Sequence, residues 1–157
     1  MLKQNQSGQT LIEALVAATI VAIVLTAIIS GVTLSVRNSR FSKNQSLATR
    51  YTQEAIESIH FYRDDAGWAT FHSKVAGNPT LCLSELPNDT DHFMSNSYID
   101  GDCMGNVIPF TTFEREAVFD AGIITDPITV TVTVTWSEGE TTHESTSTTV
   151  FTDWSRL

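Results

Sequence analysis

The chain has 157 residues, of which 41% are hydrophobic, and a formal net charge of −9 from 18 acidic and 9 basic residues. This length leaves room for one modest globular domain with an appended segment, because a second full domain would leave both cores thin. The acidic charge would repel a polyphosphate, so the composition excludes non-specific nucleic-acid binding as the main function, and no nucleic-acid partner is expected.

An uncharged, mostly apolar run occupies residues 14–36 and follows a short polar segment, MLKQNQSG. Its length matches the roughly 20 residues that a helix needs to span a bilayer. A secretory signal peptide is the alternative interpretation, but its apolar core is only about 7 to 15 residues long and ends at a small-residue cleavage site. Because no A-x-A-like site follows the run in residues 37–43, we expect a membrane helix.

The helical pattern continues beyond this run. Apolar side chains recur at spacings of three, four and seven residues; they are Phe41, Ala48, Tyr51, Ala55, Ile59 and Tyr62. No Pro or Gly occurs from Ser35 to Ala66, so we expect one helix from about Gln9 to about Arg63. Residues 9–36 would be its membrane half and residues 37–64 its amphipathic half, which we expect to pack on the core of the following domain.

Turn signals dominate the chain from Asp64 to Pro109, where D-D-A-G, G-N-P, L-P-N-D and D-G-D-C occur, and we expect turns and loops there. Its cysteines, Cys82 and Cys103, can form a single disulfide if the domain lies outside the cytoplasm. Four carboxylates between them are candidate calcium ligands, because hard oxygen ligands suit that ion: Asp89, Asp91, Asp100 and Asp102. No EF-hand loop is present, so solvated loop carboxylates are the preferred interpretation.

Period-two alternation replaces the turn signals beyond Pro109. Residues 128–136 alternate Ile, Val or Trp with Thr, which is typical of a strand with one apolar face. Ser137 to Glu140 would form a turn, and Thr142 to Trp154 would form a returning antiparallel strand. The chain therefore has an α+β pattern, in which the amphipathic half of the long helix covers a small antiparallel sheet.

An earlier strand is expected between about Thr111 and Ile124. Within it Glu114 and Glu116 flank Arg115, an arrangement that is typical of an exposed face.

Catalytic constellations are not found in the sequence. It contains no GxSxG, P-loop or GxGxxG motif. The HExxH spacing does not occur among the histidines, which are His60, His72, His92 and His143. The close pairs of a structural zinc site do not occur among Cys82, His92 and Cys103. We therefore expect no catalytic residue, no cofactor and no enzyme activity.

Gly8-Gln9-Thr10-Leu11-Ile12-Glu13, followed by the apolar run, resembles the cleavage and methylation motif of class III signal peptides in type IV pilins and pseudopilins. The resemblance implies that prepilin peptidase removes residues 1–8 by cutting after Gly8, and that Gln9 becomes the N-methylated first residue. The family most often has Phe at this position, and an N-terminal glutamine can cyclise and lose its charged amine. The resemblance further implies that Thr10, Leu11, Ile12 and Glu13 serve assembly, with Glu13 pairing with the N-terminal amine of a neighbouring subunit.

A pilin-like architecture is also implied, in which residues 65–157 form a globular antiparallel-sheet domain with a disulfide-closed loop. Residues 128–136 resemble the strand near the end of minor pilins and of the I-type pseudopilins of type II secretion. The expected function is a structural subunit, more specifically a minor pilin, of a type IV pilus or related filament. The alternatives are a pseudopilin of a type II secretion or DNA-uptake system and a membrane-anchored extracellular binding module.

The resemblance implies three partners: prepilin peptidase, other pilin subunits, and the assembly platform in the cytoplasmic membrane. The chain would cross that membrane once before assembly and join an extracellular or periplasmic filament afterwards. The basic residues indicate the opposite orientation, because Arg37, Arg40, Lys43 and Arg50 follow the apolar run and only Lys3 precedes it. We follow the motif, since prepilin peptidase requires Gly8 on the cytoplasmic side.

Overall fold

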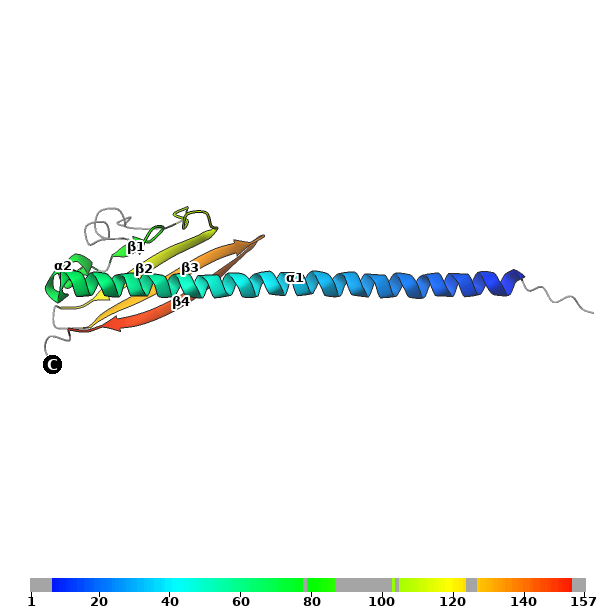
Figure 1. Ribbon diagram of the computed structural model, residues 1–157, viewed down its shortest axis with the longest axis horizontal. Coiled ribbons are helices and arrows are strands. Elements are labelled where there is room, and N and C mark those ends of the chain that lie inside the picture. Colours follow the sequence, from blue (N-terminus) through cyan, green and yellow to red (C-terminus); the bar gives the residue numbers. More distant parts are fainter. Residues whose placement is uncertain (1–6, 78, 87–102, 104, 124–126, 154–157) are drawn as a thin grey trace, which may run out of the picture. The chain divides into compact units, whose positions relative to one another are not determined.

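The computed structural model describes residues 7–77, 79–86, 103, 105–123 and 127–153. A long helix, α1 (Ser7–Ala66), is followed by a short helix, α2 (Trp68–Val75) (Figure 1). The strands of the described part are β1 (Thr80–Cys82), β2 (Phe113–Ala121), β3 (Ile128–Glu138) and β4 (Thr141–Phe151). The chain divides into two compact units, Met1–Lys43 and Asn44–Leu157, and α1 contributes residues to both.

Helix α1 confirms the long N-terminal helix expected from the periodicity. It extends without interruption through the apolar run and the amphipathic stretch, and it ends where Gly67 adopts a left-handed backbone conformation with φ of 77°. The Gly67 N–H donates to the carbonyl of Arg63 at 3.0 Å, which satisfies one of the last carbonyls of the helix. Glycine adopts this conformation without the clash that a Cβ would cause, so Gly67 separates α1 from α2.

The sheet is antiparallel throughout, and its order follows the chain: β1, β2, β3, β4. Strands β2 and β3 pair from Phe113–Trp136 to Ala121–Ile128. The turn at Gly139 and Glu140 then connects β3 to β4, with Glu138 paired to Thr141. The expected strand, turn and returning strand are therefore present, with boundaries shifted by one to three residues.

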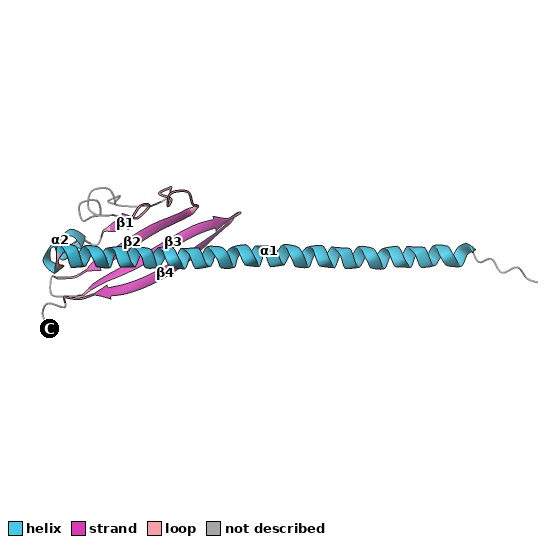
Figure 2. Ribbon diagram, in the orientation of Figure 1, coloured by secondary structure: helices cyan, strands magenta, loops and turns pink. Residues whose placement is uncertain are grey.

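The alternation in β3 sets which face of the sheet is buried. Its apolar residues, Ile128, Val130, Val132, Val134 and Trp136, are at most 2% exposed, whereas the intervening threonines are half-buried. Residues 44–66 of α1 cover the apolar face (Figure 2). Full burial of such a side chain contributes about 1.5–3 kcal/mol, so burial of this face stabilises the second unit.

Two buried clusters join the helix to the sheet. The larger one combines Ala55, Ile59 and Tyr62 of α1 with α2 and all strands of the described sheet. The smaller one places Ala48 against Phe113, Val134 and Trp136. Four of the helix side chains expected to face the core are therefore buried; Tyr51 is half-buried, with its ring 5.3 Å from that of Phe113, and Phe41 is exposed.

Part of the expected loop region proves to be regular structure. Helix α2 and strand β1 both lie between Asp64 and Pro109, where only turns and loops were expected. Strand β1 has three residues and is held by pairing with β2, as in Leu81 opposite Ala117, so it is too short to show alternation. Helix α2 is a two-turn segment that buries Phe71 and Val75. Tertiary contacts fix both elements, and the expectation of loops there is wrong.

Arg115 is the second correction. The flanking glutamates indicate an exposed face, but the register of β2 turns Arg115 inward with Phe113 and Ala117, and its side chain is 2% exposed. Its Nε donates to the carbonyl of Leu83 at 2.9 Å and its Nη1 to the carbonyl of Tyr51 at 3.1 Å. A buried cation is tolerated where its donors are bonded, so the guanidinium ties α1 to the segment after β1.

Burial lowers the pKa of Arg115 to about 10, although the carboxylate of Glu54, 4.0 Å away, opposes this shift. The guanidinium therefore stays charged at neutral pH.

Candidate functional site

The motif residues lie in the first turns of α1. Gly8, Gln9 and Thr10 have helical backbone, and the described side chains begin with Leu11, 62% exposed, and Ile12, 65% exposed. Glu13 is also exposed. Glu13 is four positions after Gln9, so the two positions lie on one face of the helix, about 6 Å apart along its axis.

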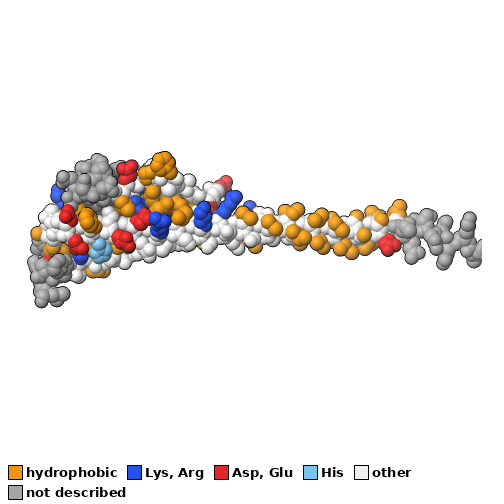
Figure 3. Space-filling view, viewed as in Figure 1, with side chains coloured by type: hydrophobic (Ala, Val, Ile, Leu, Met, Phe, Trp, Pro, Cys, Tyr) orange, Lys and Arg blue, Asp and Glu red, His pale blue; other side chains and the backbone are white. Residues whose placement is uncertain are grey.

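Large apolar side chains cover the helix beyond Glu13 on every side. They are between 46% and 66% exposed from Leu11 to Val36, and Figure 3 shows hydrophobic side chains distributed along the visible face of this part of α1. A soluble monomer rarely exposes such an extended apolar surface, because each of these side chains would gain free energy by leaving water. The surface therefore requires lipid or other protein chains around it.

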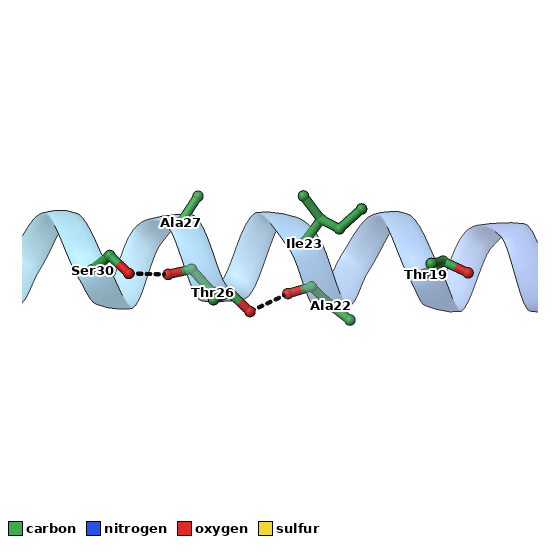
Figure 4. A pocket seen from close by; sticks show the side chains of 6 residues that line it. All are labelled: Thr19, Ala22, Ile23, Thr26, Ala27 and Ser30. Carbon is green, nitrogen blue, oxygen red and sulfur yellow. Dashed lines mark hydrogen bonds between the residues drawn. The ribbon is translucent and has the colours of Figure 1, made fainter.

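Hydroxyl side chains do not interrupt this apolar surface. Thr26 donates to the carbonyl of Ala22 at 2.8 Å and Ser30 donates to that of Thr26 at 2.9 Å (Figure 4). Thr19 and Thr33 donate in the same way to the carbonyls four residues before them. Because their donors are satisfied within the helix, these hydroxyls are compatible with a hydrocarbon environment.

The small residues of this region share one stretch of surface. A shallow depression on the helix surface is lined by small residues and by Ile23 (Figure 4); the small residues are Thr19, Ala22, Thr26, Ala27 and Ser30. Small side chains let two helices approach closely, which is how helices associate where lipid removes the hydrophobic driving force.

In the described part of the chain, α1 is long and apolar enough to cross a membrane. Three basic residues, Arg37, Arg40 and Lys43, follow its apolar part at intervals of three and are exposed. Residues with this spacing are neighbours on a helix surface. We call these three residues the basic band.

The disulfide lies in the second unit. Cys82 at the end of β1 is bonded to Cys103, with Cα atoms 5.4 Å apart, which is usual for a disulfide. Both are buried, at 3% and 6% exposure. The bond attaches residue 103 to β1 at the edge of the sheet.

The calcium candidates Asp89, Asp91, Asp100 and Asp102 lie outside the described residues. Within the described ranges, no group of three or more His, Cys, Asp or Glu side chains could hold a metal ion.

Comparison with known proteins identifies the motif. The family model described as the prokaryotic N-terminal methylation motif matches residues 3–29, and this is the class III signal-peptide motif of type IV pilins. The match covers the polar segment, Gly8 to Glu13 and most of the apolar run. No curated protein and no solved structure matches the chain.

Proposed function

Because residues 3–29 carry the N-terminal methylation motif of type IV pilins, we propose that this pilin-like chain is a structural subunit of a type IV pilus or related filament. The observation that carries the proposal is the motif together with the exposed apolar surface that follows it. Lipid would cover this surface before assembly, and the helices of other subunits would cover it in the filament.

Prepilin peptidase would cut after Gly8 and expose the amine of Gln9. In a bundle of such helices the carboxylate of Glu13 would be costly unless it faced an opposite charge. The new amine of a neighbouring subunit, at the first residue of its helix, provides that charge. Retention of the charged amine requires that Gln9 does not cyclise.

Incorporation into filaments tests the proposal directly. The chain would be produced with prepilin peptidase and an assembly platform, and sheared, sedimented filaments would be probed for it. We expect Glu13→Gln to leave cleavage unchanged and to lower incorporation at least about tenfold, because breaking a buried ion pair costs about 3–5 kcal/mol. Glu57→Gln, at an exposed position of the second unit, should assemble normally. Normal incorporation of Glu13→Gln would refute the role proposed for Glu13.

The stoichiometry of the same filaments distinguishes the finer roles. A minor pilin would be present at a small fraction of the major subunit, as the resemblance of residues 128–136 suggests. Incorporation only into a short secretion or DNA-uptake filament would favour a pseudopilin instead. Absence from every sedimentable fraction, with Met1 retained, would contradict a filament subunit and favour an anchored binding module.

A further inference from the structure

An aromatic side chain projects fully into solvent from a tight turn in the second unit. Phe110 is 108% exposed and has a φ of 62°. It follows Pro109 in a turn closed by the Thr111 N–H donating to the Ile108 carbonyl at 3.1 Å. This position of a turn normally requires glycine, and a bulky residue there is strained. Strain of this kind is characteristic of binding and active sites.

The turn is held rigidly. The Ile108 N–H donates to the carbonyl of Phe113 at 2.8 Å, and the Phe113 N–H donates to Thr111 Oγ1 at 3.2 Å. The side chain of Ile108 packs against the smaller buried cluster. Phe110 is therefore presented to solvent by a fixed backbone, and rigid aromatic side chains are the usual anchors of protein interfaces.

Acidic side chains share this end of the sheet. The turn leads into β2 at Phe113, which pairs with Trp136, so the turn and the β3–β4 turn lie at the same end (Figure 1). There Glu138 accepts a hydrogen bond from Asn44 Nδ2 at 2.6 Å, and Glu140 is exposed. Phe110 and Glu140 together define what we call the turn surface.

The two units of the chain have opposite charge. Met1–Lys43 contains four basic residues and one acidic residue, whereas Asn44–Leu157 contains five basic and 17 acidic residues. The formal charges are therefore +3 and −12, which together give the −9 of the whole chain. The positive charge of the first unit is concentrated in the basic band, and none of the ion pairs found among the described residues involves it.

We propose that the turn surface of one subunit docks on the basic band of a second copy of this chain, with Phe110 against the apolar end of the neighbouring helix and Glu140 facing its cations. The charge complementarity selects a second copy as the occupant, because the chain itself supplies a helix whose apolar surface ends in a cationic stripe. This contact rests on the proposed filament function and requires two copies of the chain to be neighbours in the filament, whether the chain is a major or a minor subunit. It adds to that function a specific lateral contact outside the helical core.

Cross-linking between two differently tagged chains tests the contact. One chain carries Thr112→Cys, an exposed position beside the turn, and the other carries Arg40→Cys. Native Cys82 and Cys103 are bonded to each other, so they do not compete. A short bifunctional maleimide applied to sedimented filaments should give a product that contains both tags. Val150→Cys, 55% exposed at the opposite end of the sheet, is the matched control and should give little product with Arg40→Cys.

Two further variants test the chemistry of the contact. Adding Phe110→Ala to the Thr112→Cys chain should lower the yield at least about tenfold, because it removes the apolar anchor. Glu140→Lys should lower the yield about two- to fivefold, the range of a surface ion pair. Adding Lys43→Glu to the Arg40→Cys chain should restore this loss. The proposal would be overturned if Phe110→Ala left the yield of the Thr112–Arg40 product unchanged. It would also be overturned if that yield equalled the yield of the Val150→Cys control.

The same samples separate the two proposals. Filaments that contain the chain but give no Thr112–Arg40 product, or a product only with a different pilin, would refute the second copy as occupant and leave the proposed function standing. Absence of the chain from sedimented filaments would refute the proposed function and this contact with it.

Discussion

Helix α1 carries apolar side chains in both units of the chain, but the two units bury them differently. From Leu11 to Val36 the large apolar side chains are about half exposed, whereas Ala55 and Ile59 of the second unit are completely buried. In the second unit the apolar residues form one stripe against the sheet, which is the usual pattern of a helix on a domain. In the first unit they surround the helix, which is the pattern of a helix embedded in lipid or among other helices.

This difference shows that one part of the helix belongs to the core of a folded domain, whereas the other part has an apolar surface that this core does not bury. The core of the second unit lies within the chain, and its stability is a property of the folded monomer. The large apolar side chains of the first unit are about half exposed, so under the proposed function they would contribute to insertion and assembly. Substitutions in the two units should therefore affect different measurements.

The largest effect is expected in the core of the second unit. Phe119 is completely buried, with its ring 6.3 Å from that of Phe71. Phe119→Ala should lower the free energy of unfolding by about 3–5 kcal/mol, measured by urea denaturation of the full chain in detergent. Phe61→Ala, 61% exposed on α1, should change it by less than about 0.5 kcal/mol. Equal effects of the two variants would contradict the assigned core.

A charge in the first unit should affect insertion and spare the fold. Val24 is 49% exposed in the middle of the apolar run, and Val24→Asp should disfavour membrane insertion by about 2.5–3.5 kcal/mol. Carbonate extraction of membranes would show this loss, while urea denaturation should be unchanged. Thr146→Asp, at an exposed position of β4, should be retained in membranes like the unsubstituted chain. Full retention of Val24→Asp would argue against a lipid-embedded helix.

Removal of the buried cation of the second unit should have a smaller effect. Arg115→Met keeps most of the side-chain volume but leaves the carbonyl of Leu83 without its side-chain donor. The free energy of unfolding should fall by about 1–3 kcal/mol, the cost of an unsatisfied buried polar group. Arg115→Lys should also be destabilising, because a lysine cannot reproduce the fork that reaches both Leu83 and Tyr51. An unchanged urea midpoint in both variants would contradict the structural role of the guanidinium.

The smallest expected effect is a pH dependence near the end of α1. Burial lowers the pKa of His60 below its ordinary value of 6.5, Arg63 lowers it further, and Asp64 opposes the shift. The native state then binds a proton less readily than the unfolded state, so this stability is fully present above pH 6.5 and is lost as the pH falls below it. Urea midpoints at about pH 7.5 and pH 5.5 should differ more for the unsubstituted chain than for His60→Gln. An identical difference in both would exclude His60 as the cause.

The long elements of this fold could be predicted from the sequence, because each of them has a clear and repeated pattern of apolar residues. The uninterrupted helical pattern predicts α1, and the Ile-Val-Thr alternation predicts β3 and the strand that returns from it. Strand β1 has only three residues and depends on pairing with β2, so no local pattern could show it. Helix α2 depends on the burial of Phe71 in the cluster that includes the strands. This contact is between residues far apart in the sequence, so the local sequence does not show it.

Two residues were not identified from sequence, for different reasons. Arg115 has glutamates on both sides, and their charge concealed the alternation of Phe113, Ala117 and Phe119 that turns it inward. Greater weight on these flanking apolar residues would have predicted its burial. Phe110 gave no signal, because Pro-Phe in a turn does not indicate a positive φ. By contrast, the motif residues Gly8 to Glu13 were recognisable from sequence, since a short linear motif does not depend on the fold.

Cleavage after Gly8 would create the amine that we propose as the partner of Glu13, and the mature N-terminus tests this step most directly. Intact mass and N-terminal sequencing would be measured for the chain produced with and without prepilin peptidase. We predict loss of residues 1–8 and a mature chain that begins at Gln9 with one added methyl group, only when the peptidase is present. A chain that retains Met1 with the peptidase present, or one cut after the apolar run, would contradict the account.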